Sequence, residues 1–100
     1  LADEAFLRRL GYKIRVDALT EEQYRTVFQQ VCKQLNIDYV ETAFQYLLNE
    51  YHHKEGKPLL ACYPRDILNQ LRDFALYERR EVALNHELIG WAWRNYFAQH

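Results

Sequence analysis

The chain has 100 residues, of which 49% are hydrophobic and 27% are charged, and its formal net charge is -1. This length allows one domain at most, and this balance of residues predicts a folded core rather than disorder. The near-neutral charge and the lack of a long basic run argue against a nucleic-acid-binding protein, so no direct contact with nucleic acid is expected.

Cysteine usage and hydropathy indicate the compartment. Cys32 and Cys62 are isolated, which predicts buried free thiols rather than a disulfide and suits a reducing cytoplasm. No apolar stretch approaches the roughly 18 residues that span a bilayer, and Asp3 and Glu4 do not fit a secretory signal. We therefore expect a cytoplasmic protein without membrane contact. Because the sequence starts at Leu1 and contains no methionine, we also expect a piece of a longer polypeptide.

Two short elements are predicted at the start of the chain. Residues 2–10 show a helical pattern that includes the adjacent Arg8 and Arg9 and ends at Gly11. Residues 12–16 alternate between apolar and basic side chains, which predicts one strand. Since a lone strand cannot form a sheet, we expect it to belong to a sheet in a preceding domain.

Two amphipathic helices are predicted next. Thr20 and Gln23 form a capping-box pattern, and apolar residues at helical spacing predict a helix over residues 21–35. Asp38 and Glu41 repeat the capping pattern before a second apolar stripe. The second helix is therefore expected to begin near this pair.

The second half of the chain predicts two more helices. The second helix should end near His52, where a loop with charged residues, glycine and proline follows. Pro64 suits the first turn of a third helix that runs to about Arg79, and Asn85 is a suitable cap for the last helix. Four amphipathic helices joined by short loops predict an all-α bundle, preceded by a short helix and an extended segment.

The chain lacks a complete catalytic motif: it contains no Walker loop, no H-E-x-x-H, no G-x-S-x-G and no paired C-x-x-C. His52 and His53 point about 100° apart on a helix, so a solvated helix end is favoured over a metal site. Cys32 lies beside an apolar stripe, which argues against a nucleophile. Trp91 and Trp93 are expected to pack in the core or at a subunit contact.

Arg65 is the candidate binding residue. In the stretch ACYPRDILNQL it falls in the first turn of the predicted third helix. A helix N-terminus favours anions, and the guanidinium fork matches phosphate oxygens, so a phosphate is the natural ligand. The alternative from the residues alone is an ion pair between Arg65 and a nearby carboxylate.

These residues, taken in order, resemble the end of an AAA+ ATPase module. The stretch DEAFLRRLGYKIRV, residues 3–16, is similar to the region where a helix delivers an arginine to the subunit edge and leads into the last strand of the nucleotide-binding subdomain. The following helices resemble the C-terminal lid, whose third helix opens with the second sensor arginine, and YPRD places Arg65 there. Cys62 and Tyr63 depart from the small or capping residue that the family usually has before this helix.

The resemblance implies a division of the chain and of its roles. Residues 1–19 would be a remnant of the base subdomain, and residues 20–100 would be the helical lid. Arg65 would contact the nucleotide bound in its own chain, whereas Arg9, with Arg8 as the alternative, would be the arginine finger in the neighbouring subunit's site. The full-length protein would bind ATP and magnesium, and no cofactor is expected in this fragment.

The implied partners are the preceding nucleotide-binding subdomain and the neighbouring subunits of a homo-oligomeric ring. Because this chain lacks Walker motifs, it is not expected to be an enzyme on its own, but to couple ATP hydrolysis to subunit motion in the parent protein. The alternative is a free-standing helical protein–protein interaction module with exposed aromatic side chains. Against a further alternative, a helical DNA-binding domain, the last helix carries a single arginine, Arg94, and no lysine.

Overall fold

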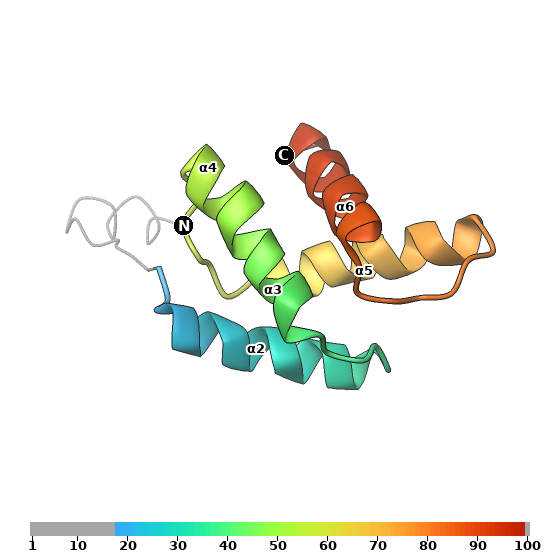
Figure 1. Cartoon of the computed structure of the whole chain (residues 1–100), viewed down its shortest axis with the longest axis horizontal. Helices are drawn as coiled ribbons and strands as arrows, with labels where there is room; N and C mark the ends of the chain where they lie inside the picture. The colour runs from blue at the N-terminus through green and yellow to red at the C-terminus, as the bar shows by residue number, and fades with distance from the viewer. Residues whose placement is uncertain (1–17, 100) are drawn as a thin grey trace, which may run out of the picture.

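The computed structural model describes residues 18–99, and within that range it contains four helical stretches and no strand (Figure 1). They are α2 (Glu21–Gln34), then α3 (Glu41–Leu47) continued by the π-helical segment η2 (Leu48–His52) and by α4 (His53–Glu55), then α5 (Tyr63–Tyr77) and α6 (His86–Gln99). The prediction of an all-α fold with four helices is confirmed.

The predictions for the start of the chain concern residues that lie outside the described range. They are the short helix over residues 2–10, the strand over residues 12–16, and the positions of Arg8 and Arg9. No helix among the described residues combines the length and the apolar character that a bilayer crossing needs.

The core lies where the four helical stretches meet. In Figure 1, α2 and α5 run across the view, whereas α3 with α4 and α6 rise steeply. Helix α5 packs against both α2 and α6, and α3 packs against α6. Every stretch contributes fully buried side chains, among them Tyr24, Phe28, Phe44, Leu47, Ile67, Leu68, Leu71, Leu88 and Trp93. Burying one such side chain contributes about 1.5–3 kcal/mol, so the predicted apolar stripes hold the bundle together.

The two tryptophans pack on α5 and in the core, as predicted. Trp93 is 1% exposed. Trp91 is half-buried and stacks on Phe74 of α5, with ring centroids 3.9 Å apart. Phe74 is itself partly buried and packs against the core.

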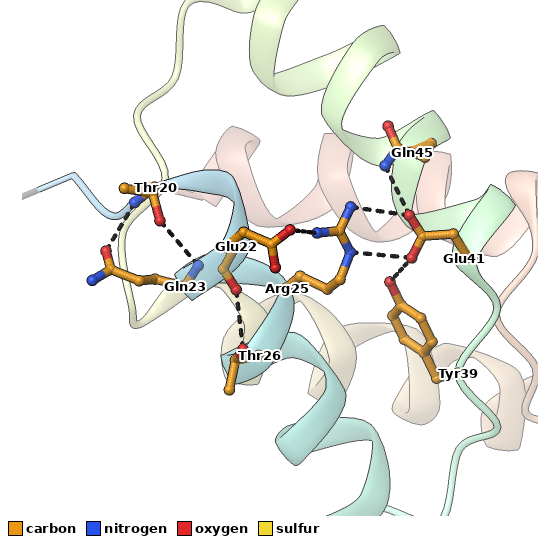
Figure 2. Close-up of polar contacts among 8 residues, drawn as sticks. All are labelled: Thr20, Glu22, Gln23, Arg25, Thr26, Tyr39, Glu41 and Gln45. Atoms are coloured by element: carbon orange, nitrogen blue, oxygen red, sulfur yellow. Dashed lines mark hydrogen bonds and ion pairs between the residues drawn. The ribbon is translucent and has the colours of Figure 1, made fainter.

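The helix starts at Thr20 and Asn85 form as predicted. Thr20 Oγ1 accepts a hydrogen bond from the Gln23 amide at 3.1 Å, and Gln23 Oε1 accepts one from the Thr20 amide at 3.0 Å (Figure 2). Asn85 Oδ1 accepts a hydrogen bond from the Leu88 amide at 2.8 Å. Each bond satisfies an amide that has no partner within its helix.

The predicted capping box of Asp38 and Glu41 is wrong. Helix α3 begins at Glu41, the residue before it is Val40, and no side chain caps this end. The pattern fails because tertiary contacts engage Glu41 elsewhere, which local spacing cannot reveal.

Glu41 instead ties α3 to α2. Arg25 of α2 donates from Nε to one Glu41 carboxylate oxygen at 3.2 Å and from Nη2 to the other at 3.0 Å (Figure 2). Tyr39 and Gln45 donate to the same carboxylate, and Glu22 accepts from Arg25 at 3.1 Å. Such a two-pronged pair fixes geometry better than a single contact.

The second helix extends beyond its predicted end near His52 and stops at Glu55, before Gly56 with its φ of 67°. Hydrogen bonds in a π-helix join residues five apart, so η2 brings Tyr46 and Tyr51 to one side of the helix. Their rings lie 5.7 Å apart. This side faces α6, because Tyr46 stacks on His86 with ring centroids 3.8 Å apart.

Gly90 allows η2 to approach α6 closely. A Cβ atom at Gly90 would lie 2.7 Å from Tyr51 Oη and 3.1 Å from Arg94 Nη1. Glycine within a helix costs about 1 kcal/mol relative to alanine. The Tyr51 hydroxyl therefore occupies space that only glycine leaves open at this position.

We expect Gly90→Ala to lower the free energy of unfolding by about 1 kcal/mol, since overpacking costs about 1–3 kcal/mol and the better helix former returns about 1. In a Tyr51→Phe background the nearest ring atom, Cζ, lies 3.7 Å from the added methyl group, an ordinary contact, and the remaining close atom, Arg94 Nη1 at 3.1 Å, is at the end of a flexible, exposed side chain that can move away. There Gly90→Ala should raise the free energy of unfolding by up to about 1 kcal/mol. Urea unfolding of the four variants measures this reversal, and the same sign in both backgrounds would contradict the packing account.

The Arg25–Glu41 pair predicts an acid-sensitive contribution to stability. The hydrogen bonds from Arg25 are the main reason that the pKa of Glu41 falls to about 2 from 4.5. Because the pKa is lower in the folded state, this stabilisation is complete above about pH 4.5 and is lost as the pH falls toward 2. In Glu41→Gln the free energy of unfolding should change less over this range, as measured by urea unfolding at stepped pH. Glu81→Gln, at an exposed position, should keep the wild-type slope.

Candidate functional site

Arg65 lies in the first turn of α5, and its side chain is exposed. The residue before it, Pro64, is buried, so the start of the helix is fixed to the core. Arg65 Nη2 donates a hydrogen bond to Gln34 Oε1 at 3.0 Å, which joins the start of α5 to the end of α2. Within residues 18–99 Arg65 forms no ion pair, so the alternative of a nearby carboxylate partner finds no support there.

Among the residues that the structure describes, this neutral partner leaves the charge of Arg65 without an ion pair. A hydrogen bond to an uncharged acceptor contributes about 0.5–1.5 kcal/mol, whereas a bond between two ionised groups is roughly twice as strong. An anion that reached Arg65 could therefore replace the Gln34 amide as the acceptor. This arrangement can bind a phosphate group without first breaking an ion pair.

The backbone at the start of α5 also favours an anion near Arg65. Cys62 precedes α5, and no side chain caps this end of the helix. The positive end of the helix dipole therefore remains available to an anion. The negative charge of Asp66, in the same turn, opposes anion binding in part. Its carboxylate already accepts a hydrogen bond from the Tyr96 hydroxyl at 2.7 Å.

The two cysteines differ in exposure. Cys32 is buried, as predicted, and burial raises the pKa of its thiol to about 11. Cys62 is a free thiol but is exposed, so the prediction of burial is wrong for it. It lies in the turn before α5 rather than within the apolar face of a helix. Partial burial raises the pKa of the Cys62 thiol as well, so neither cysteine is activated as a nucleophile.

The prediction that His52 marks a solvated helix end is wrong, because its side chain is 1% exposed. Its Nε2 lies 2.7 Å from Tyr24 Oη, and its Nδ1 lies 3.3 Å from the Lys57 carbonyl oxygen. A carbonyl only accepts, so Nδ1 carries the proton and Nε2 accepts from the tyrosine. Burial lowers the pKa of His52 to about 4, which keeps it neutral near pH 7. His52 is therefore a structural link between α2 and η2.

A metal site is not found in the part of the chain that the structure describes. No group of three or more His, Cys, Asp or Glu side chains is close enough there to hold an ion. His53 is exposed and lies 3.4 Å from a carboxylate oxygen of Glu21, away from the buried His52. The adjacent histidines thus have different surroundings and no common ligand.

A hollow of about 330 Å³ lies between α5 and α6, but it does not fit a triphosphate. Its lining is polar and carries two carboxylates, from Asp66 and Asp73. Those charges repel phosphate groups. This hollow therefore offers a phosphate no enclosed nucleotide site, and the candidate feature at the start of α5 is the exposed guanidinium of Arg65.

Sequence reasoning placed Arg65 at the start of a helix but did not find its hydrogen-bond partner, Gln34. The two residues are 31 positions apart, and Gln34 is one of several polar residues on α2 with no motif around it. Its position in the last turn of the first amphipathic helix was the only available signal. Helix packing, which the sequence pattern does not specify, brings it to Arg65.

The chain was compared with known protein families, curated proteins and solved structures. Residues 20–95 match the model of a family described as Domain of unknown function (DUF8689). No curated protein and no solved structure shows significant similarity to the chain. The match covers the four helical stretches from the cap of α2 to the last turns of α6. The chain therefore belongs to the DUF8689 family.

Proposed function

We propose that this helical bundle is the C-terminal lid of an AAA+ ATPase, where it senses the bound nucleotide and couples ATP hydrolysis to subunit motion. The observation that supports the proposal is the exposed Arg65 at the start of α5, hydrogen-bonded to the neutral Gln34. A guanidinium that keeps its charge and has no carboxylate partner among residues 18–99 suits contact with a triphosphate held by another part of the protein.

In this proposal the nucleotide competes with Gln34 for Arg65. The γ-phosphate oxygens accept the hydrogen bonds, and the guanidinium then stabilises the charge that spreads over them in the transition state. After hydrolysis and loss of phosphate, Gln34 becomes the acceptor again. Arg65 thus has two alternative partners, one for each nucleotide state.

The packing of α5 supports the idea that a change of partner at Arg65 moves the whole bundle. The residues that follow Arg65 along α5 are anchored in the core, since Ile67 and Leu68 are at most 1% exposed. Close-packed interiors move as units rather than deforming locally. A pull on Arg65 would therefore rotate the bundle as a rigid body.

The proposal assigns the remaining roles to parts of the protein that the described residues do not include. Arg9, or alternatively Arg8, would act as the finger in the neighbouring subunit's site. ATP and magnesium would be bound by the preceding nucleotide-binding subdomain, which would pack against this lid. Neighbouring subunits of a homo-oligomeric ring in the cytoplasm would be the other partners.

A free-standing protein–protein interaction module is the competing proposal. Its support is the exposure of Leu76 (59%) and Tyr77 (83%) at the end of α5. Two adjacent exposed apolar side chains are ordinary on a protein surface and do not form an extended patch. The arrangement at Arg65 therefore supports the lid proposal more strongly than these two side chains support an interaction module.

Turnover of the parent ATPase tests the proposal. We expect Arg65→Ala, in the polypeptide that joins this segment to its nucleotide-binding subdomain, to lower the rate of ATP hydrolysis by about 100-fold or more, while ring assembly is retained. Arg72→Ala is the matched control, because it removes an arginine two turns further along the same helix. It should leave the rate within a factor of about two.

Two results would count against the lid. One is an unchanged hydrolysis rate in Arg65→Ala, measured by phosphate release with assembly checked by sizing. The other is a parent sequence that has no Walker loop upstream of Leu1. Either result leaves the interaction module as the remaining proposal.

A further inference from the structure

Four side chains from two helical stretches gather where η2 meets α6. We call this cluster the Arg94 site; it consists of Tyr46, Tyr51, His86 and Arg94. The π-helical turn places the two tyrosines on the same side. On α6, His86 and Arg94 are eight residues apart with Gly90 midway, so the three lie along one stripe of the helix.

Two polar atoms of the Arg94 site, from Tyr51 and Arg94, lie close together above Gly90. Tyr51 Oη and Arg94 Nη1 lie 2.7 Å and 3.1 Å from a single point, the position that a Cβ atom of Gly90 would take. Burial raises the pKa of Tyr51, Tyr46 adds to the rise, and Arg94 opposes it. The Tyr51 hydroxyl and the Arg94 guanidinium therefore lie side by side over Gly90, where α6 has no side chain of its own.

No carboxylate neutralises Arg94 within the part of the chain that the structure describes. Its side chain is exposed, and it forms no ion pair there. Every acidic side chain on the two helical stretches that carry the site has another partner. These pairs are Glu41 with Arg25, Glu50 with Lys54 at 2.7 Å, Glu55 with the Trp93 indole at 3.0 Å, and Glu87 with Arg80 at 2.7 Å.

We propose that the Arg94 site binds an oxyanion group, a phosphate or a carboxylate, of a partner molecule. The guanidinium fork suits two oxygens at once, and the tyrosine hydroxyls can donate further hydrogen bonds. The rings of Tyr46 and Tyr51 form an apolar wall beside the charge, which reduces its screening by water. Arginine and tyrosine are also the side chains that contribute most to binding at protein interfaces.

The stacked His86 orients the site. Its ring lies within 6° of parallel to the Tyr46 ring, with centroids 3.8 Å apart, and the Tyr46 ring in turn meets the Tyr51 ring at 76°. The site lies on the α6 face of the bundle and shares no residue with the contact between Arg65 and Gln34. The inference therefore stands independently of the proposed function.

Titration of the full chain with small anions, followed by NMR, tests this inference. The reporters are the side-chain Nε–Hε signal of Arg94 and the backbone amide of Gly90. Sodium phosphate, sodium acetate and sodium chloride are compared at equal ionic strength, because chloride accounts for general screening. We expect saturable shifts of both reporters with phosphate or with acetate, and only small linear shifts with chloride.

Variants separate the Arg94 site from other cations of the chain. Arg94→Gln should weaken the saturable response of Gly90 by about tenfold, and Tyr51→Phe should weaken it several-fold. Arg72→Gln and Arg65→Gln are matched controls, each removing an exposed or half-exposed arginine of α5. Both should leave the Gly90 response unchanged.

The anion that saturates identifies the ligand group. Saturation by phosphate alone supports a phosphoryl ligand, saturation by acetate alone supports a carboxylate of a partner, and saturation by both supports a general oxyanion site. The inference is overturned if neither anion saturates the reporters up to about 100 mM, or if Arg94→Gln responds like the unmodified chain.

Discussion

Arg65 donates its hydrogen bond to the amide oxygen of Gln34, and the functional account depends on this partner being neutral. A carboxylate in that place would hold the guanidinium in an ion pair that any phosphate ligand must first break. The amide positions the side chain without cancelling its charge. Pro64, the residue before Arg65, is buried and holds the start of α5 against the core. Pro64 therefore sets where Arg65 lies, whereas the neutral Gln34 leaves the charge of its guanidinium intact.

Arg94 resembles Arg65 in that it forms no ion pair within the part of the chain that the structure describes. Both arginines are exposed, whereas Arg25 and Arg80 are held in two-pronged pairs with Glu41 and Glu87. The paired arginines join segments of the bundle, since Arg25 links α2 to α3 and Arg80 links the loop after α5 to α6. The near-neutral net charge of the chain therefore conceals local positive charge at Arg65 and at Arg94, and composition alone could not have indicated either position.

Much of the fold follows from local patterns, while the details of both sites do not. Apolar spacing predicted the four helices, and the caps at Thr20 and Asn85 formed because their partners lie three residues away. The π-helical turn and the buried His52 depend on contacts between distant segments, as the separation of 28 positions between Tyr24 and His52 shows. The exposed position of Arg65 could be predicted from its place after Pro64. Its neutral partner could not, because helix packing decides which polar side chain of α2 reaches it.

The most direct measurement of the central claim is a structure of the parent protein with a non-hydrolysable ATP analogue. The account predicts that the Arg65 guanidinium leaves Gln34 and lies within about 2.7–3.2 Å of a γ-phosphate oxygen. A structure in which the nucleotide is bound while Arg65 still donates to Gln34, with no phosphate oxygen in reach, would contradict it.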